Sequence, residues 1–132
     1  MSRQNVELVQ RAYEQVSRGK IDQDLIDPGF ELHENVLAPD AAVYRGPEGL
    51  MKWLEASVEA FADFRFEAER FIDRGEWVFA PVRASGRGKE SGAPFSARYV
   101  TAFRLKDGKF LFAGSYSDLP QAFEAAGLPG SE

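Results

Sequence analysis

The stretch from Phe64 to Ser117 constrains the fold more than any other part of the chain, because it predicts four β-strands in a row. Arg74-Gly75 and Asp107-Gly108 are tight-turn sequences, and Asp-Gly is among the strongest hairpin signals. Strands of about ten residues exceed the common length of roughly five or six. Long antiparallel strands twist and coil, so such a sheet curls and needs other segments to fill its hollow. The predicted strands are 64–73, 76–88, 95–106 and 109–117.

The remaining segments are predicted to supply that filling. Val6, Val9 and Tyr13 recur at helical spacing, which predicts a helix over 2–17. The fold class is therefore α+β: a strongly curved antiparallel sheet wrapped around N-terminal helices, with a short C-terminal helix, in a single domain over 1–132. The other predicted elements are a short helix over 21–26, a strand over 30–36, an extended piece over 42–44, a helix over 46–62 and a final helix between Asp118 and Gly127.

Composition narrows the classes of partner and location. The net charge is −5 and no run of basic residues occurs, which disfavours nucleic acid as a partner. No apolar run approaches the roughly 18 residues that a membrane span needs, and the sequence opens directly on a polar amphipathic helix rather than a signal peptide. Without cysteine there is no disulfide framework and no thiolate chemistry. We therefore expect a cytoplasmic protein.

One carboxylate interrupts an otherwise apolar row in the early predicted strand. Alternation places Glu34 between Leu32 and Val36 on one face of that strand and His33 on the other face. This is the most informative local feature of the sequence, because a buried carboxylate can serve as a general base. The alternatives are a carboxylate at a pocket mouth, or one that pairs with an arginine such as Arg98.

The long strands also alternate, and their two faces are predicted to differ. One face is expected to be bulky and aromatic, as packing against helices requires, while the other is small and aliphatic in its middle. A sheet face that is free in solvent should be polar, so we expect the second face to pack on another copy of the chain in a homodimer. The expected aromatic face carries Trp77, Phe79, Tyr99, Thr101, Phe103, Phe110, Phe112 and Tyr116, and the opposite face carries Val78, Ala80, Val82, Val100, Ala102, Ala113 and Ser115.

Six stretches of local sequence carry a resemblance to a known family. They are NVELVQRAYEQVSRG at 5–19, FELHE at 30–34, YRGPEGLMKWL at 44–54, SGRGKESG at 85–92, FRLKDGK at 103–109 and SDLPQAFEAAGL at 117–128. With the order of elements, they resemble the cone fold of the nuclear transport factor 2-like superfamily, and within it the SnoaL-like group of small bacterial proteins. The resemblance is specific for fold rather than function, because this fold hosts isomerases, cyclases, hydrolases, dehydratases and non-catalytic binders.

The resemblance implies a deep pocket between the curved sheet and the helices. In ketosteroid isomerases of this superfamily, a first-helix tyrosine and a protonated carboxylic acid hold the substrate oxygen, and a first-strand carboxylate is the base. By position, Tyr13 corresponds to that tyrosine and Glu34 to that base, but Thr101 stands where the second acid would be. Steroid-type isomerisation is therefore disfavoured. In the related polyketide cyclases an Asp or His does the acid–base work, and the lone His33 lies one residue out of register with the core-facing row.

Two function hypotheses follow. In the first, the protein is an enzyme without metal or organic cofactor that moves a proton on an apolar, carbonyl-bearing ligand such as a polyketide-like or terpenoid ring. Glu34 would be the base, and Tyr13 and Thr101 would orient the ligand oxygen. In the second, it is a non-catalytic module that binds an apolar ligand or serves as a dimeric scaffold. The expected ligand-binding residues are Trp53, Phe79, Tyr99, Thr101, Phe103 and Tyr116, although aromatic residues at this spacing also form plain core.

Overall fold

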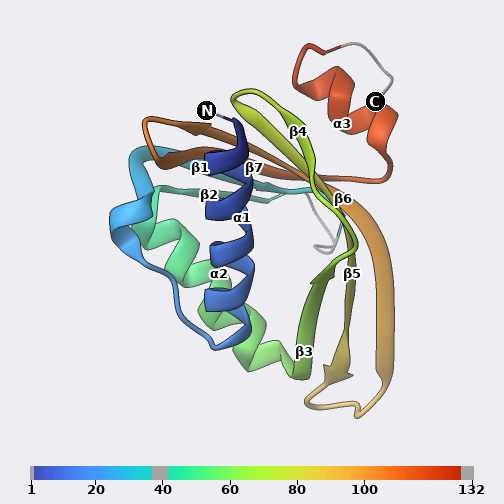
Figure 1. Cartoon of the computed structure of the whole chain (residues 1–132). Coiled ribbons are helices and arrows are strands. Elements are labelled where there is room, and N and C mark those ends of the chain that lie inside the picture. The colour runs from blue at the N-terminus through green and yellow to red at the C-terminus, as the bar shows by residue number, and fades with distance from the viewer. Residues whose placement is uncertain (1, 37–41, 129–132) are drawn as a thin grey trace.

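The computed structural model describes residues 2–36 and 42–128 of the 132-residue chain. Within these residues the strands form one curved, seven-stranded sheet that does not close on itself, together with three α-helices, which confirms the α+β class. Figure 1 shows α1 and α2 within the curve of the sheet, and α3 on its opposite side. None of the helices in this described part is long and apolar enough to span a membrane.

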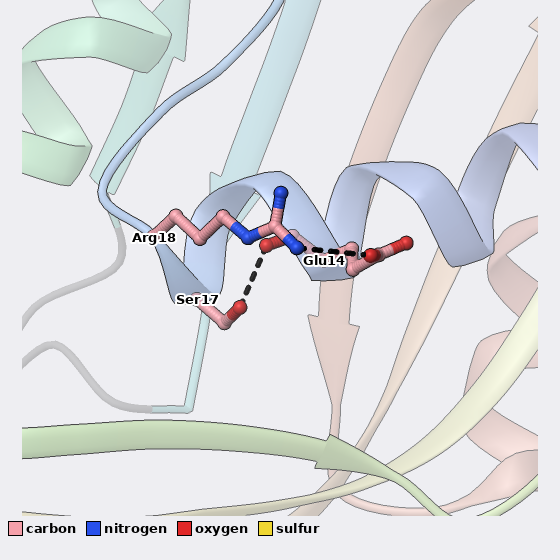
Figure 2. Close-up of polar contacts among 3 residues, drawn as sticks. All are labelled: Glu14, Ser17 and Arg18. Carbon is pink, nitrogen blue, oxygen red and sulfur yellow. Dashed lines mark hydrogen bonds and ion pairs between the residues drawn. The ribbon is translucent and has the colours of Figure 1, made fainter.

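The first helix, α1 (Ser2–Ser17), ends where the sequence predicts. Gly19 has a φ of 72°, the left-handed conformation that closes helices and that glycine adopts without strain. Figure 2 shows two further contacts at this end. The Ser17 hydroxyl donates to the Glu14 carbonyl at 2.6 Å, and the Arg18 guanidinium donates to the Glu14 carboxylate at 3.3 Å. All of these features are local, so the sequence itself stops the helix.

The segment after α1 is more extended than predicted. The expected second helix is a single turn of 3₁₀-helix, η1 (Gln23–Leu25), which the Asp22 carboxylate caps by accepting from the amide of Asp24. The strand that follows begins at Ile26, inside the predicted helix, because Ile26 is already extended. The next elements are β1 (Ile26–Glu34), β2 (Ala42–Arg45) and α2 (Gly46–Ala60).

The first of the predicted long strands is divided in two, and both parts pair with β5. At the division, the amide of Glu69 donates to the carbonyl of Pro81 at 2.8 Å. In a β-strand, the N–H and C=O of one residue point toward the same neighbouring strand. The carbonyl of Pro81 faces the segment between β3 and β4, and proline has no N–H to donate there. The pairing with β5 is therefore interrupted at this point. The bounds are β3 (Phe61–Ala68), β4 (Ile72–Arg74), β5 (Trp77–Gly88), β6 (Pro94–Lys106) and β7 (Lys109–Tyr116).

The strand order is β2-β1-β7-β6-β5-β3, with β4 beside β5. The β6–β7 hairpin turns as predicted, with φ of 53° at Asp107 and 76° at Gly108, as a type I′ turn requires. The sequence analysis did not predict that β1 joins the other edge of β7 in parallel. This pairing brings the end of β1 beside the end of β7, where Glu34 meets Ser115.

The pairing register between β5 and β6 corrects the predicted sheet faces. Phe79 pairs with Ala102, and Ala80 pairs with Thr101. Directly paired residues share a face, so Phe79 lies on the outer face and Thr101 on the inner face, toward α1 and α2. The sequence analysis had grouped Phe79 with Thr101. Within each strand the alternation was right, but a register shift of one residue exchanges the faces of neighbouring strands.

A register irregularity in β7 changes the faces again. Phe110 pairs with Leu105, whereas Phe112 pairs with Arg104, so the pairing shifts between them. Phe110 therefore packs in the inner core, while Phe112 and Tyr116 lie on the outer face. The predicted aromatic face is thus divided between the two sides of the sheet.

The last helix, α3 (Leu119–Ala125), covers the middle of the outer face. The Asp118 carboxylate caps it by accepting from the amide of Gln121 at 2.9 Å, and the amide of Leu128 donates to the Phe123 carbonyl as the chain folds back. Of the aliphatic residues that motivated the homodimer prediction, Val100 and Ala102 are therefore covered by the chain's own helix. Others of that set, Val78, Ala80 and Val82, lie on the inner face instead. The buried residues of this outer cluster are Phe79, Val100, Ala102, Ala122 and Phe123.

Candidate functional site

A cavity of about 110 Å³ lies between α1, α2 and the inner face of the sheet. Asp22 is the one exposed residue among the described residues that line it, so we place its opening beside Asp22. Most of the lining is apolar. The lining residues are Ala12, Tyr13, Gln15, Val16, Ile21, Asp22, Leu25, Ile26, Phe30, Leu32, Glu34, Leu50, Trp53, Phe66, Tyr99, Thr101, Phe103, Phe110, Ala113 and Ser115.

Tyr13 and Thr101 meet in the cavity wall. Tyr13 comes from α1 and Thr101 from the middle of β6, and a hydrogen bond joins their side chains. Burial raises the pKa of Tyr13 far above its ordinary value of 10.0, and the hydrogen bond with Thr101 opposes this rise only in part. Tyr13 therefore keeps its proton across the physiological pH range, so it presents a neutral hydroxyl.

Tyr99 adds a second neutral phenol on the same face of β6. Burial is the main cause that raises the pKa of Tyr99 well above 10.0, and the nearby Tyr13 and Glu34 add electrostatic repulsion against its phenolate form. Electrostatic interaction weakens with distance, so the effect of Tyr13 and Glu34 on Tyr99 means that the three side chains lie close together.

Glu34 is held at the end of β1 by a contact that spans two strands. Its side chain is buried, at 6% exposure, and its Oε1 accepts a hydrogen bond from the Ser115 hydroxyl at 2.9 Å. The same hydroxyl accepts from the backbone amide of Asn35 at 2.9 Å, and the Asn35 side-chain amide donates to the Ser115 carbonyl at 3.0 Å. Because a backbone amide can only donate, the Ser115 hydroxyl proton is directed at Glu34.

Aromatic rings form much of the cavity wall. Trp53 of α2 stacks on Phe66 of β3 with a centroid distance of 5.8 Å and an interplanar angle of 28°. Tyr13 meets Phe103 edge-on at 5.8 Å and 83°, and Phe103 meets Phe110 edge-on at the same distance. These contacts hold the rings of α1, α2, β3, β6 and β7 against one another, so the wall is built from the whole fold.

The volume of the cavity limits its ligand. An engineered apolar cavity of about 150 Å³ binds benzene. A cavity of about 110 Å³ accordingly admits a ligand slightly smaller than one six-membered ring. The polyketide-like or terpenoid ring of the sequence analysis would have to extend through the opening beside Asp22.

The structure brings most of the predicted site residues together. Phe79 and Tyr116 are the exceptions, because both lie on the outer face near α3 rather than in the cavity wall. The sequence analysis missed Ser115, which it assigned to the outer face of the fourth long strand, and Phe66, whose aromatic character was the only available signal. The predicted residues that line the cavity are Tyr13, Glu34, Trp53, Tyr99, Thr101 and Phe103.

His33 lies outside the cavity. Its Nε2 contacts the Glu31 carboxylate at 2.8 Å, and its ring centroid is 5.0 Å from that of Phe112 on the outer face. The His33 contact lowers the pKa of Glu31 more than any other interaction does. In the part of the chain that the structure describes, no group of three or more His, Cys, Asp or Glu side chains could hold a metal ion.

The cavity therefore combines one buried carboxylate, that of Glu34, with several neutral hydroxyls in an apolar setting. The carboxylate of Glu34 can accept a proton, and the hydroxyls of Tyr13 and Tyr99 can donate hydrogen bonds to a ligand oxygen. An apolar lining strengthens such electrostatic interactions, because it keeps water away from them.

Comparison with known proteins identifies a family for most of the chain. The family model described as the SnoaL-like domain matches residues 9–112. No match was found among curated proteins.

Solved structures from three bacteria are similar over nearly the whole chain, each with a TM-score of 0.74 or higher. One, described as a candidate SnoaL-like polyketide cyclase from Jannaschia sp. CCS1, is 22% identical over 97% of this chain and 94% of that chain, with a TM-score of 0.74. An NTF2-like protein from Burkholderia thailandensis E264 is 23% identical over 89% and 95%, with a TM-score of 0.77. A protein of ketosteroid isomerase-like fold from Catenulispora acidiphila, in complex with trimethylamine, is 16% identical over 94% and 95%, with a TM-score of 0.74. At these identities the likeness shows the fold alone.

Proposed function

This chain belongs to the SnoaL-like family, and from that membership we propose that its cavity takes a small, largely apolar carbonyl compound on which Glu34 moves a proton. One observation carries the proposal: the buried carboxylate of Glu34 lines a mostly apolar cavity together with Tyr13 and Thr101. Such a carboxylate in a concave apolar site is a functional candidate on physical grounds. The trimethylamine bound to one structural neighbour is of the size that this cavity admits.

The proposed step is proton abstraction next to the ligand carbonyl. The Glu34 carboxylate takes the proton, and the electron pair of the broken C–H bond forms a C=C bond while the carbonyl oxygen gains negative charge. The Tyr13 hydroxyl donates a hydrogen bond to that oxygen and stabilises the charge as it develops. The protonated Glu34 then returns its proton to the same carbon or to a conjugated one. The result is exchange or isomerisation without net oxidation.

Thr101 is assigned a supporting role in this step. The hydrogen bond with Thr101 lowers the pKa of Tyr13, as a bond donated to the phenolic oxygen does. In that arrangement the proton of Tyr13 remains available for the ligand oxygen. Thr101 thus takes part through Tyr13, in place of the second carboxylic acid of ketosteroid isomerases.

The test uses hydrogen exchange of small ketones, because the natural substrate is not needed for it. Acetone and cyclopentanone are incubated in D₂O with the full-length protein, and loss of the α-proton signals is followed by NMR. We expect exchange above the buffer rate, with a loss of about 100-fold or more in Glu34→Gln, since general-base catalysis contributes roughly 10²–10⁴-fold.

Glu67→Gln is the matched control, because it makes the same chemical change on β3, where Glu67 is exposed outside the cavity. It is expected to exchange both ketones at the wild-type rate. Equal exchange by wild type and Glu34→Gln would refute the assignment of Glu34 as the base.

A second candidate function is ligand binding without chemistry. The observation that favours it is Thr101, since the cavity offers a hydroxyl where the isomerases use an acid. In that case acetone and cyclopentanone shift the NMR signal of the Trp53 indole, while the α-protons of both ketones exchange at the buffer rate.

Homodimerisation and a cytoplasmic location are also proposals. Because α3 covers the middle of the outer face, a homodimer would use the surrounding part, where the side chain of Val43 is 44% exposed. Light scattering after gel filtration measures the mass directly. A mass near the 14.7 kDa of one chain, independent of concentration, would contradict the homodimer.

A further inference from the structure

We infer that this cavity selects small organic cations, of about the size of tetramethylammonium, over neutral and anionic molecules of the same shape. The inference deepens the proposed function by naming the charge of the ligand. It rests on the same cavity as that function but does not require proton transfer by Glu34.

The charges around the cavity are of one sign. Among the described residues that line it, Asp22 and Glu34 are acidic, and none is Lys, Arg or His. Glu34 is 6% exposed, so little water screens its carboxylate, whereas Asp22 stands exposed at the opening. A cleft with low-dielectric walls and charge of one sign attracts ions of the opposite sign. An anion would enter against both carboxylates.

The aromatic rings of the cavity wall also favour a cation, as the two carboxylates do. A cation within about 6 Å of an aromatic centroid is attracted by the negative face of the ring, most strongly when the site is desolvated. Trp53 and Phe66 line the cavity as a stacked pair, and Tyr13 and Phe103 line it with their planes nearly perpendicular. A cation in so small a space lies close to several of these rings.

The size and polarity of the cavity exclude most other cations. At about 110 Å³ it is smaller than the cavity of about 150 Å³ that accommodates benzene. Its mostly apolar lining does not replace the water shell of a metal ion, because hard cations need several oxygen ligands. An alkylammonium ion carries its charge inside an apolar shell, which matches both properties. A ligand that carries an ammonium group beside a carbonyl would satisfy this inference and the proposed function together.

The test compares three branched molecules of similar shape: tetramethylammonium, tert-butanol and pivalate. Each is titrated into the full-length protein at constant ionic strength, and the indole N–H signals of the two tryptophans are followed by ¹H–¹⁵N NMR. Trp53 lines the cavity, whereas Trp77 packs beside the outer cluster and serves as an internal reference. We expect Trp53 to shift and Trp77 to stay in place. Tetramethylammonium should bind at least about tenfold more tightly than tert-butanol, and pivalate should not bind.

Glu34→Gln and Glu67→Gln form a matched pair for the source of the selectivity. Glutamine keeps an oxygen that can accept from the Ser115 hydroxyl, so Glu34→Gln removes the charge with little change of shape. It should lower the affinity for tetramethylammonium about tenfold and leave the affinity for tert-butanol unchanged. Glu67→Gln, which removes an equal charge outside the cavity, should change neither.

Several results would overturn the inference: tert-butanol or pivalate binding as tightly as tetramethylammonium, no shift of Trp53 with tetramethylammonium, or equal affinity of both variants for it. The α-proton exchange of the two ketones shows whether the cation inference or the proposed function has failed. Loss of cation preference with intact exchange by wild type refutes the cation inference alone. Cation preference without exchange supports the cation inference and refutes the proton transfer.

Discussion

The two faces of β6 consist of alternate residues of one strand, yet one face is closely packed and the other borders a cavity. On the outer face, Ala102 is 1% exposed beneath α3, in a cluster of buried apolar side chains. On the inner face, Thr101 is 9% exposed and borders a cavity beside Tyr13 and Glu34. The outer face is filled by the chain itself, and the inner face is left partly empty.

This difference separates a site that stabilises the fold from one that can bind a ligand. Close packing without voids gives the most stability, because every void forfeits contacts between atoms. A cavity lined with hydroxyls and a carboxylate gives up that stability and gains a place for a ligand. Substitutions on the two faces should therefore have different effects, and each of the following predictions tests that contrast.

The largest effect is expected from Phe123→Ala. Phe123 is 1% exposed and meets Phe79 edge-on with a centroid distance of 4.5 Å. Its removal should lower the free energy of unfolding by about 3 kcal/mol or more, as is typical for a buried Phe. Phe66→Ala in the cavity wall should cost less, because Phe66 is only partly buried and already borders empty space. Urea denaturation of both variants measures the difference, and equal losses would contradict the contrast.

A smaller effect should distinguish two alanines that receive the same added methyl groups. Ala102→Val adds volume beneath α3, where the cluster is closed, and should destabilise by about 1–3 kcal/mol through overpacking. Ala113→Val adds the same volume at the cavity wall, where space is available, and should be neutral within about 0.5 kcal/mol. Thermal unfolding is the measurement. A greater loss at Ala113 would mean that the cavity is not free space.

Alkaline pH should weaken the inner face through its tyrosines. Burial raises the folded-state pKa of Tyr13 above 10.0, so the folded and unfolded states both keep the proton below pH 10. Above pH 10 the unfolded chain releases a proton that the folded chain retains, and stability falls by up to about 1.4 kcal/mol per pH unit for each such tyrosine.

Tyr13→Phe should make the slope of stability against pH shallower above pH 10, measured by urea denaturation at a series of pH values. The substitution also removes the hydrogen bond with Thr101, which changes the free energy of unfolding by the same amount at every pH. The slope of that free energy against pH, and not its absolute value, therefore reports the titration of Tyr13. Tyr116→Phe on the outer face should change the slope less, because Tyr116 is only partly buried. An unchanged slope in Tyr13→Phe would show that its hydroxyl is not buried.

The smallest effect is expected at His33. Its contacts are with Glu31 and Phe112 outside the cavity, so His33→Gln should leave ketone exchange and tetramethylammonium binding at wild-type levels. It should also return the pKa of Glu31 toward its ordinary value, because the His33 contact is the largest cause that lowers it. Side-chain carboxyl NMR of Glu31 measures that change. Loss of exchange in His33→Gln would place the histidine in the chemistry after all.

Much of the candidate site was predictable because its residues depend on local patterns. The alternation around Glu34 placed this carboxylate among apolar neighbours, and the structure buries it. The helical spacing of Tyr13 placed it on the inward face of α1, and it lines the cavity. Both predictions follow from the repeat of a single element, which is written in the sequence.

Phe79 and Tyr116 show where that reasoning ended. Phe79 was assigned correctly relative to its own strand, but the face that a strand shares with its neighbour depends on the register between them. Tyr116 was grouped with Phe110 of the same strand, and the irregularity in β7 places the two on opposite faces. The loop between β5 and β6 and the irregularity in β7 set that register, and no periodic pattern encodes either. Ser115 was missed for the same reason, because its contact with Glu34 depends on the parallel pairing of β1 and β7.

The sequence by itself determined the end of α1, the Asp107-Gly108 turn, the alternation within β5 and β6 and the α+β class, because each arises from neighbours along the chain. The tertiary structure alone decided which faces align, that α3 covers the outer face, and that a cavity of about 110 Å³ remains beside Glu34. These features depend on the register and packing of segments far apart in the sequence. There, a shift of one residue exchanges the inside of the sheet with the outside.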